Sequence, residues 1–183
     1  MALAILVPLA VAASSPLLQW RQPVYIAAGF AGVVGLGLLL LQPLLASGLM
    51  PGVNWRRWHR AIGAVLVAAV LLHVAGLWIT SPPDVVDALL LRSPTPFSVW
   101  GVLAMWAVFA AAVLAGLRRH VRPRLWRRAH TGLVVAAAGG TVAHALLIEG
   151  AMGTASKTLL CALVLLATGW VVWRRGAWRA QPR

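Results

Sequence analysis

Six apolar stretches, separated by short segments rich in proline, serine and arginine, divide this sequence of 183 residues. A helix of about 20 apolar residues, rising about 1.5 Å per residue, spans the roughly 30 Å hydrocarbon core of a bilayer. On this pattern we place helices at residues 2–18, 24–45, 58–80, 97–117, 128–148 and 158–173. The pattern predicts an all-α integral membrane protein, in which a six-helix bundle forms a single domain over residues 1–183.

The first apolar stretch and the end of the third helix are defined by nearby arginine and proline residues. The first stretch, residues 2–18, has a second interpretation as a cleaved signal peptide, but Arg21 follows the apolar run, whereas a signal peptide carries its basic residues before it. We therefore expect a helix there. The third helix is expected to end before Pro82 and Pro83, because proline cannot continue the backbone hydrogen-bond ladder. A loop is expected from that point to Pro96.

Composition and charge support the membrane assignment and orient the helices. Hydrophobic residues make up 61% of the chain and charged residues only 10%. The net charge of +13 does not indicate a nucleic-acid partner, because the basic residues lie between apolar stretches rather than on one solvated face. If the connectors after the second and fourth helices and the C-terminal tail are cytoplasmic, that side holds 13 of the 16 Lys and Arg residues. The positive-inside rule then predicts a multi-pass protein of a bacterial-type inner membrane, with both termini in the cytoplasm and membrane lipid around it.

Two of the expected helices carry the same unusual pair of histidines. His59 and His73 are fourteen residues apart on the third helix, and His130 and His144 are fourteen residues apart on the fifth. Fourteen residues rise about 21 Å and end about 40° short of four full turns, so both histidines of a helix share a face. The third and fifth helices run parallel, because one helix separates them. His59 is therefore expected level with His130, and His73 level with His144.

Two histidines at each of two depths are the ligand set of two bis-histidine haems stacked across a membrane. An ionisable residue inside a bilayer usually marks a functional site. Zinc normally takes three or four protein ligands, and each level here offers two histidines, with Glu149 as the one acidic residue near the outer level. We therefore prefer haem to metal transport or a proton relay. Six-coordinate iron favours electron transfer, and the absence of a C-x-x-C-H motif indicates haem b.

Other residues are candidates for holding these haems or packing around them. The arginines beside the inner histidines either bind haem propionates or contact lipid head groups: Arg56, Arg57, Arg60, Arg127 and Arg128. Arg92 and Lys157 are the outer propionate candidates. Trp106 lies at a depth between the two levels, where it either assists coupling between the haems or packs as an ordinary side chain. Four glycines permit the close approach of a macrocycle or of a neighbouring helix: Gly63, Gly132, Gly139 and Gly140.

Two further residues are assigned no part in the site. Cys161 is expected to be a buried hydrophobe, because it is the single cysteine and lies inside an apolar stretch. His120 is expected in a solvated loop, because it lies in the basic connector and has no partner at its level.

The four histidines and their spacing resemble the ferric reductase transmembrane domain. That six-helix, two-haem core is shared by ferric-chelate reductases, NADPH oxidases and the haem-bearing membrane subunit of methionine sulfoxide reductase. The resemblance covers nearly the whole chain. It implies electron transfer from the cytoplasmic face, through the inner and then the outer haem, to an acceptor outside. Full-length members continue into a flavin and NADPH module, whereas no G-x-G-x-x-G sequence follows the last helix here. We therefore expect a separate flavoprotein, which supplies the flavin, or a quinol as electron donor.

Several functions remain open at this point. The first is an oxidoreductase component that reduces ferric chelates or oxygen at the outer face. The second is an electron-transfer subunit that docks a periplasmic oxidoreductase, as the sulfoxide reductase relative does. A quinol-oxidising cytochrome b is a further alternative, although respiratory cytochrome b is longer and uses a Pro-Glu-Trp-type motif, and b561-type cytochromes spread their ligands over four helices. A haem-free transporter or scaffold would purify colourless.

Overall fold

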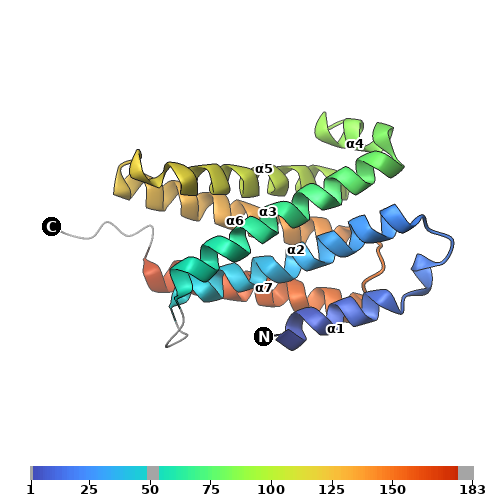
Figure 1. Cartoon of the computed structure of the whole chain (residues 1–183), viewed down its shortest axis with the longest axis horizontal. Helices are drawn as coiled ribbons and strands as arrows, with labels where there is room; N and C mark the ends of the chain where they lie inside the picture. Colours follow the sequence, from blue (N-terminus) through green and yellow to red (C-terminus); the bar gives the residue numbers. More distant parts are fainter. Residues whose placement is uncertain (1, 49–53, 177–183) are drawn as a thin grey trace.

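The computed structural model describes residues 2–48 and 54–176, and helices make up nearly all of these two ranges (Figure 1). In chain order the elements are α1 (Ala2–Ala13), η1 (Pro16–Leu18), α2 (Pro23–Ser47), α3 (Trp55–Thr80), α4 (Pro82–Leu89), α5 (Pro96–Gly116), η2 (Leu117–Arg119), α6 (Pro123–Leu147) and α7 (Thr154–Arg175). The two elements marked η are single turns of 3₁₀ helix. No strand occurs in the described ranges, so the predicted all-α class is confirmed.

Five helices of the described ranges are long and apolar enough to cross a membrane, namely α2, α3, α5 with η2, α6 and α7. They correspond to the second to sixth predicted helices, and their ends differ from the predicted ones by at most five residues. Pro23, Pro96 and Pro123 each occupy the first turn of a helix, where a missing N–H costs nothing. Gly48 ends α2 with φ 71°, the left-handed conformation that glycine adopts without strain.

The first predicted helix is shorter in the structure than the apolar pattern indicated. α1 covers twelve residues, ends at Ala13 and gives way to η1 at Pro16. Proline disfavours helical backbone at the residue before it, and the Ser15 hydroxyl instead accepts the Leu17 N–H at 3.3 Å. A continuous helix over residues 2–18 is therefore wrong beyond Ala13. Twelve residues extend only about 18 Å, and α1 runs beside only part of α2 and α7 (Figure 1).

The segment after α3 is the second difference from prediction. α3 ends at Thr80, as expected, but α4 begins at Pro82 where a loop was expected. A proline in the first helical turn has its φ already set, so the proline pair that ends α3 also starts α4. The Ser81 hydroxyl donates to the carboxylate of Asp84 in the first turn of α4. The outer end of the bundle therefore carries an ordered helix.

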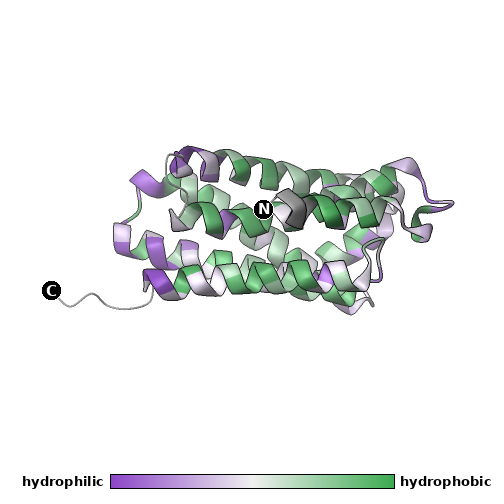
Figure 2. Cartoon of the chain, turned by 90° about the horizontal axis from the view of Figure 1, so that it is seen from below, coloured by the Kyte–Doolittle hydropathy of each residue, from purple (hydrophilic) through white to green (hydrophobic). Residues whose placement is uncertain are grey.

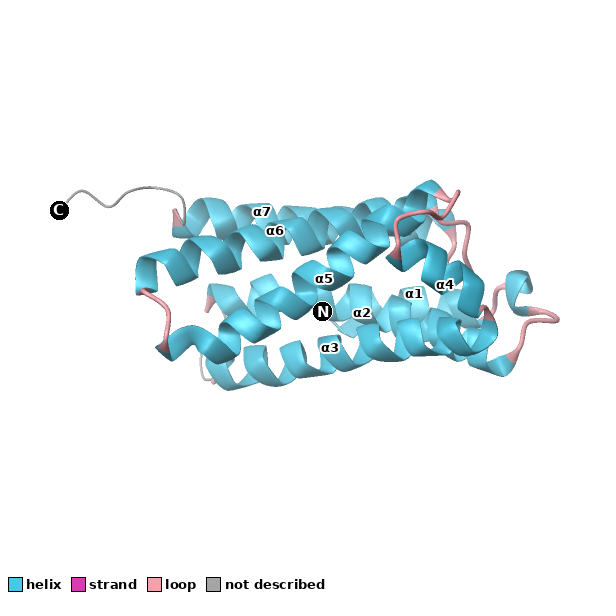
Figure 3. Ribbon diagram, turned by 90° about the horizontal axis from the view of Figure 1, so that it is seen from above, coloured by secondary structure: helices cyan, strands magenta, loops and turns pink. Residues whose placement is uncertain are grey.

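The bundle is organised as two helical hairpins, and α7 packs against one helix of each. α2 packs along α3, α5 packs along α6, and α7 contacts both α2 and α6. Leu160, Cys161 and Val164 of α7 are the largest fully buried side chains, which confirms the expectation for Cys161. Figure 2 shows hydrophobic residues along the middle of the helices and hydrophilic residues toward their ends, and Figure 3 places the connecting segments at the two ends. This distribution is that of a bundle surrounded by lipid.

Candidate functional site

The four histidines project from α3 and α6, and three of them bind a backbone carbonyl of the helix that precedes their own. His59 Nδ1 lies 3.3 Å from Gln42 O of α2, and His73 Nδ1 lies 2.8 Å from Ala28 O of the same helix. His144 Nδ1 lies 2.9 Å from Phe97 O of α5. The first helix of each hairpin therefore fixes imidazoles of the second: both in the α2–α3 hairpin, and that of His144 in the α5–α6 hairpin.

These contacts decide which ring nitrogen is available for a ligand. A carbonyl oxygen only accepts a hydrogen bond, so each Nδ1 must carry the proton and donate it. Nε2 then holds the free lone pair. Histidines that bind metals almost always donate their other ring N–H to a carbonyl or carboxylate, which fixes the tautomer and raises the basicity of the ligand. His59, His73 and His144 have this arrangement.

The carbonyl acceptors repeat with the same spacing as the histidines. Ala28 and Gln42 are fourteen residues apart on α2, as His73 and His59 are on α3. The position fourteen residues after Phe97 on α5 is Ala111, and its carbonyl interacts with His130. This contact falls short of a hydrogen bond of normal geometry, since His130 Nδ1 is buried without a hydrogen-bond partner among the described residues. The two hairpins thus repeat one design, with a difference at His130.

The outer histidines lie opposite one another across the two hairpins. The ring centroids of His73 and His144 are 6.4 Å apart, and the ring planes are inclined at 78°. Two imidazoles bound through nitrogen to one metal ion at about 2 Å have ring centres roughly 6 Å apart. The outer pair therefore already has the separation that a shared iron requires.

The inner histidines are also neighbours, though not in ring contact. His59 and His130 are close enough to interact electrostatically. No ring contact joins them in the part of the chain that the structure describes. The contacts therefore join His73 with His144 and His59 with His130, each at its own end of the bundle.

Two glycines make room for the outer imidazoles, and sequence reasoning missed both. A Cβ on Gly101 of α5 would lie 2.7 Å from His144 Nδ1, and a Cβ on Gly32 of α2 would lie 3.0 Å from His73 Nδ1. Each glycine follows the carbonyl acceptor by four residues, so each lies one turn from it on the same face. Of the glycines that the sequence suggested, Gly140 serves the packing of α5 on α6, because a Cβ there would lie 3.1 Å from Trp100 O and 3.1 Å from the Cβ of Ala104.

The inner arginines lie at the basic end of the bundle and are exposed: Arg56, Arg57, Arg60, Arg127 and Arg128. The Arg56 guanidinium lies over the ring of Trp55, 5.1 Å from its centroid. Arg175 of α7 also lies over Trp55, at 5.9 Å, and interacts electrostatically with His59. Arg175 is a basic neighbour of the inner site that the sequence did not single out. Only its place at the end of the last apolar stretch could have indicated it.

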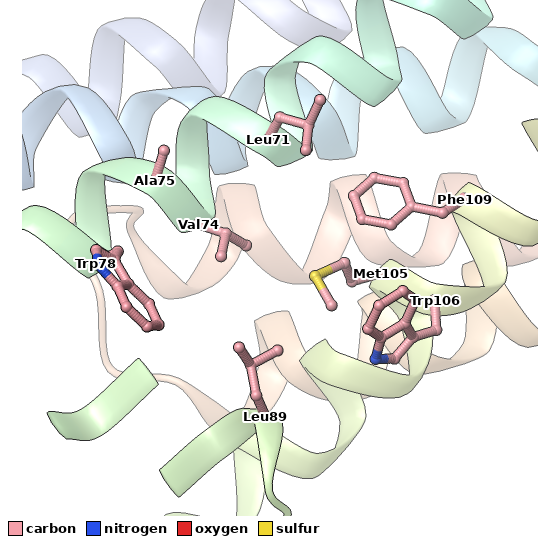
Figure 4. Close-up of a pocket in the computed structure, with 8 residues that line it drawn as sticks. All are labelled: Leu71, Val74, Ala75, Trp78, Leu89, Met105, Trp106 and Phe109. Atoms are coloured by element: carbon pink, nitrogen blue, oxygen red, sulfur yellow. The ribbon is translucent and has the colours of Figure 1, made fainter. Parts of the chain in front are cut away.

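The remaining candidates lie away from the histidine pairs. Lys157 is buried, and its Nζ donates to Ile148 O at 2.8 Å, beyond the C-terminal end of α6. Arg92 is exposed on the connector between α4 and α5. Trp106 is 57% exposed and packs edge-on against Phe109, with ring centroids 6.0 Å apart. It lines an apolar groove of about 330 Å³ between α3, α4 and α5, together with Leu71 and six other residues (Figure 4).

The donor set at each level fits a haem. Across the described residues no group of three or more His, Cys, Asp or Glu side chains gathers. A bare zinc ion needs such a group, whereas a porphyrin supplies four nitrogens and requires only two axial imidazoles. α3 and α6 do not pack closely on one another.

Apolar helices that could each cross a bilayer, with paired histidines inside them, define a multi-pass membrane protein. The chain matches the family described as "Ferric reductase like transmembrane component" over residues 29–141, which is more than half of its length, and it belongs to that family. The match includes His59, His73 and His130 and ends three residues before His144. Comparisons with curated proteins and with solved structures found no match. The family resemblance drawn from the histidine spacing is therefore confirmed.

Proposed function

We propose that this protein transfers single electrons across a membrane through two haem b groups, each held by one histidine of α3 and one of α6. The observation that carries the proposal is the outer pair, in which His73 and His144 face each other at 6.4 Å with both Nδ1 atoms bound to backbone carbonyls. Membership of the ferric reductase-like family supports the same function.

The chain's own part in this function is to hold four imidazoles still. His73 and His144 would hold the outer haem, and His59 and His130 would hold the inner one. Bound haem supplies an iron that takes up and gives up one electron at a time. A haem held by two histidines would leave no open position at its iron for a small molecule. The carbonyls of Ala28, Gln42 and Phe97 keep the rings from turning, so little reorganisation accompanies a change in charge.

We further propose that the basic connectors after α2 and α5, and the C-terminal end of α7, lie in the cytoplasm of a bacterial-type inner membrane. Two points support this orientation. Thirteen of the sixteen basic residues fall on one side, and the positive-inside rule assigns that side to the cytoplasm. The electron donor is then a cytoplasmic flavoprotein or a quinol, and the acceptor is a ferric chelate or oxygen at the outer face.

A docking role for a periplasmic oxidoreductase is the second candidate, and α4 favours it. This helix packs against α3 and α5 at the outer end and carries Asp84 and Asp87. A subunit that docks a partner needs a fixed surface, whereas chelate reduction needs only an accessible haem edge. Substituting both aspartates with Asn would weaken a partner's binding and leave chelate reduction unchanged.

Electron transfer across vesicles tests the proposed function. Purified protein is reconstituted into liposomes that contain trapped ferricyanide, and membrane-impermeant dithionite is added outside. We expect rapid bleaching of the ferricyanide with the natural protein and with His120→Ala, since His120 is exposed and outside the site. His73→Ala should slow bleaching to the rate of protein-free vesicles. Equal rates for the natural protein and empty vesicles would contradict the proposal.

A further inference from the structure

His130 differs from the other three histidines of the site in what holds its ring. Its Nδ1 is buried and has no hydrogen-bond partner among the described residues. The ring instead lies parallel to the indole of Trp126, four residues earlier on α6, with centroids 5.0 Å apart and planes inclined at only 9°. This stacking takes the place that a backbone carbonyl has at the other histidines.

Trp126 is itself fixed by two contacts with the preceding segment. Its Nε1–H donates to Leu114 O of α5 at 2.9 Å. The guanidinium of Arg118, in η2, lies over the indole 5.1 Å from its centroid. A cation over an aromatic face is held by the quadrupole of the ring. The indole therefore cannot turn without losing both contacts, and it presents a rigid plane to His130.

The corresponding tryptophan of the other hairpin does not act in this way. Trp55 precedes His59 by four residues, as Trp126 precedes His130. Trp55 faces the guanidinium groups of Arg56 and Arg175, and no stacking contact with His59 occurs among the described residues. His59 already has the Gln42 carbonyl. The tryptophan stacks on its histidine in the hairpin where the carbonyl contact falls short of a hydrogen bond.

We propose that Trp126 is a positioning residue, which sets the ring plane of His130 and thereby the geometry and retention of the inner haem. The inference rests on the proposed function, because it concerns a ligand of that haem. The angle of an axial imidazole about its bond to iron fixes the order of the iron d orbitals, and hence the electron paramagnetic resonance of the ferric state. Loss of an outer-shell partner of a metal-binding histidine typically weakens metal binding about 10- to 100-fold.

Four variants of the full chain test this assignment: Trp126→Leu, Trp126→Phe, Arg118→Gln and the matched control Trp55→Leu. Each is purified with its haems, and two quantities are measured. One is the low-temperature resonance of both ferric haems, and the other is the rate at which haem passes to excess apomyoglobin. Neither measurement depends on electron-transfer activity, and the outer haem serves as an internal reference in every sample.

We expect Trp126→Leu to shift the resonance of the inner haem and to speed its loss about tenfold, with the outer haem unchanged. Trp126→Phe keeps an aromatic ring beside His130, so its inner-haem resonance should match that of the natural protein. Arg118→Gln should change the resonance and the rate of haem loss less than Trp126→Leu does. Trp55→Leu should match the natural protein in both measurements. If Trp126→Leu does not fold, Trp126→Met replaces it under the same expectations. An inner haem unaffected by loss of the ring, or equally affected by Trp55→Leu, would overturn the assignment. Natural protein without an inner haem would instead refute the proposed function.

Discussion

The imidazole rings of His73 and His144 are inclined at 78° to one another, with 6.4 Å between their centroids. Each ring is held at this angle by its own hairpin, His73 through Ala28 O and His144 through Phe97 O. Because the two anchors come from different helices, neither ring can turn toward the other without breaking a hydrogen bond. The near-perpendicular arrangement is thus a property of the fold.

This angle predicts the spectrum of the outer haem. Perpendicular axial imidazoles leave two iron d orbitals nearly equal in energy, which gives a low-spin ferric signal of strong anisotropy. Electron paramagnetic resonance of the oxidised protein should contain such a signal. His144→Ala should abolish it, and His120→Ala should leave it in place. Finding only signals typical of parallel imidazoles would contradict the predicted outer geometry.

Gly101 should be needed for the outer haem because of the space it leaves. A methyl group at this position would lie 2.7 Å from His144 Nδ1, so the imidazole must move or the helices must part. Overpacking of this kind costs about 1–3 kcal/mol. We expect Gly101→Ala to reduce the haem content at the outer level while the inner haem stays bound.

Gly139→Ala is the matched control for that substitution. Gly139 lies on α6, and a Cβ there would meet nothing within 4 Å. Replacing a helical glycine by alanine at an open position favours the helix by up to about 1 kcal/mol. The haem content and the thermal stability of Gly139→Ala should therefore equal or slightly exceed those of the natural protein. Equal loss of the outer haem in both variants would show that the space at Gly101 has no special role.

The buried Lys157 should matter for the join between α6 and α7 more than for the haems. Its Nζ donates to Ile148 O at 2.8 Å, and loss of such a bond leaves a carbonyl without its partner. We expect Lys157→Met to lower the unfolding free energy by about 1–3 kcal/mol and to leave both haem spectra unchanged. A shift in the reduction potential of the outer haem, measured by redox titration, would instead assign Lys157 to a propionate.

Labelling of introduced cysteines should reveal the orientation in the membrane. Cys161, the single cysteine, is buried and can be replaced by Ala to give a background without thiols. In that background Arg92→Cys and Arg122→Cys place exposed thiols on opposite connectors. A membrane-impermeant maleimide should label Arg92→Cys in intact spheroplasts and Arg122→Cys only after lysis. The reverse pattern would overturn the proposed topology.

The helices and the level pairing of the histidines could be predicted from sequence because both depend on periodicity. Apolar length predicts a span, and a spacing of fourteen residues places two histidines on one face. The structure adds that the first apolar stretch is broken at Ser15 by the proline that follows it. The structure also contains α4, which the sequence did not predict. A proline pair has the same sequence whether it only ends one helix or also begins the next.

The hydrogen-bond partners of the histidines could not be predicted, because every residue has a backbone carbonyl and the sequence does not show which one accepts the bond. Ala28 and Phe97 look like ordinary apolar residues of a span, and only the register of each hairpin shows that their carbonyls meet an imidazole. Trp55 and Trp126 illustrate the same limit. They occupy equivalent places before His59 and His130, yet one faces arginines and the other stacks on its histidine.

The most direct test of electron transfer through two haems is a reduced-minus-oxidised absorption spectrum of the purified protein, with haem and protein quantified in the same sample. We expect a low-spin b-type spectrum and about two haems per chain. The ratio should fall to about one in each of the variants His59→Ala, His73→Ala, His130→Ala and His144→Ala, and it should remain about two in His120→Ala. A colourless protein, or a haem content that these four substitutions leave unchanged, would contradict the proposal.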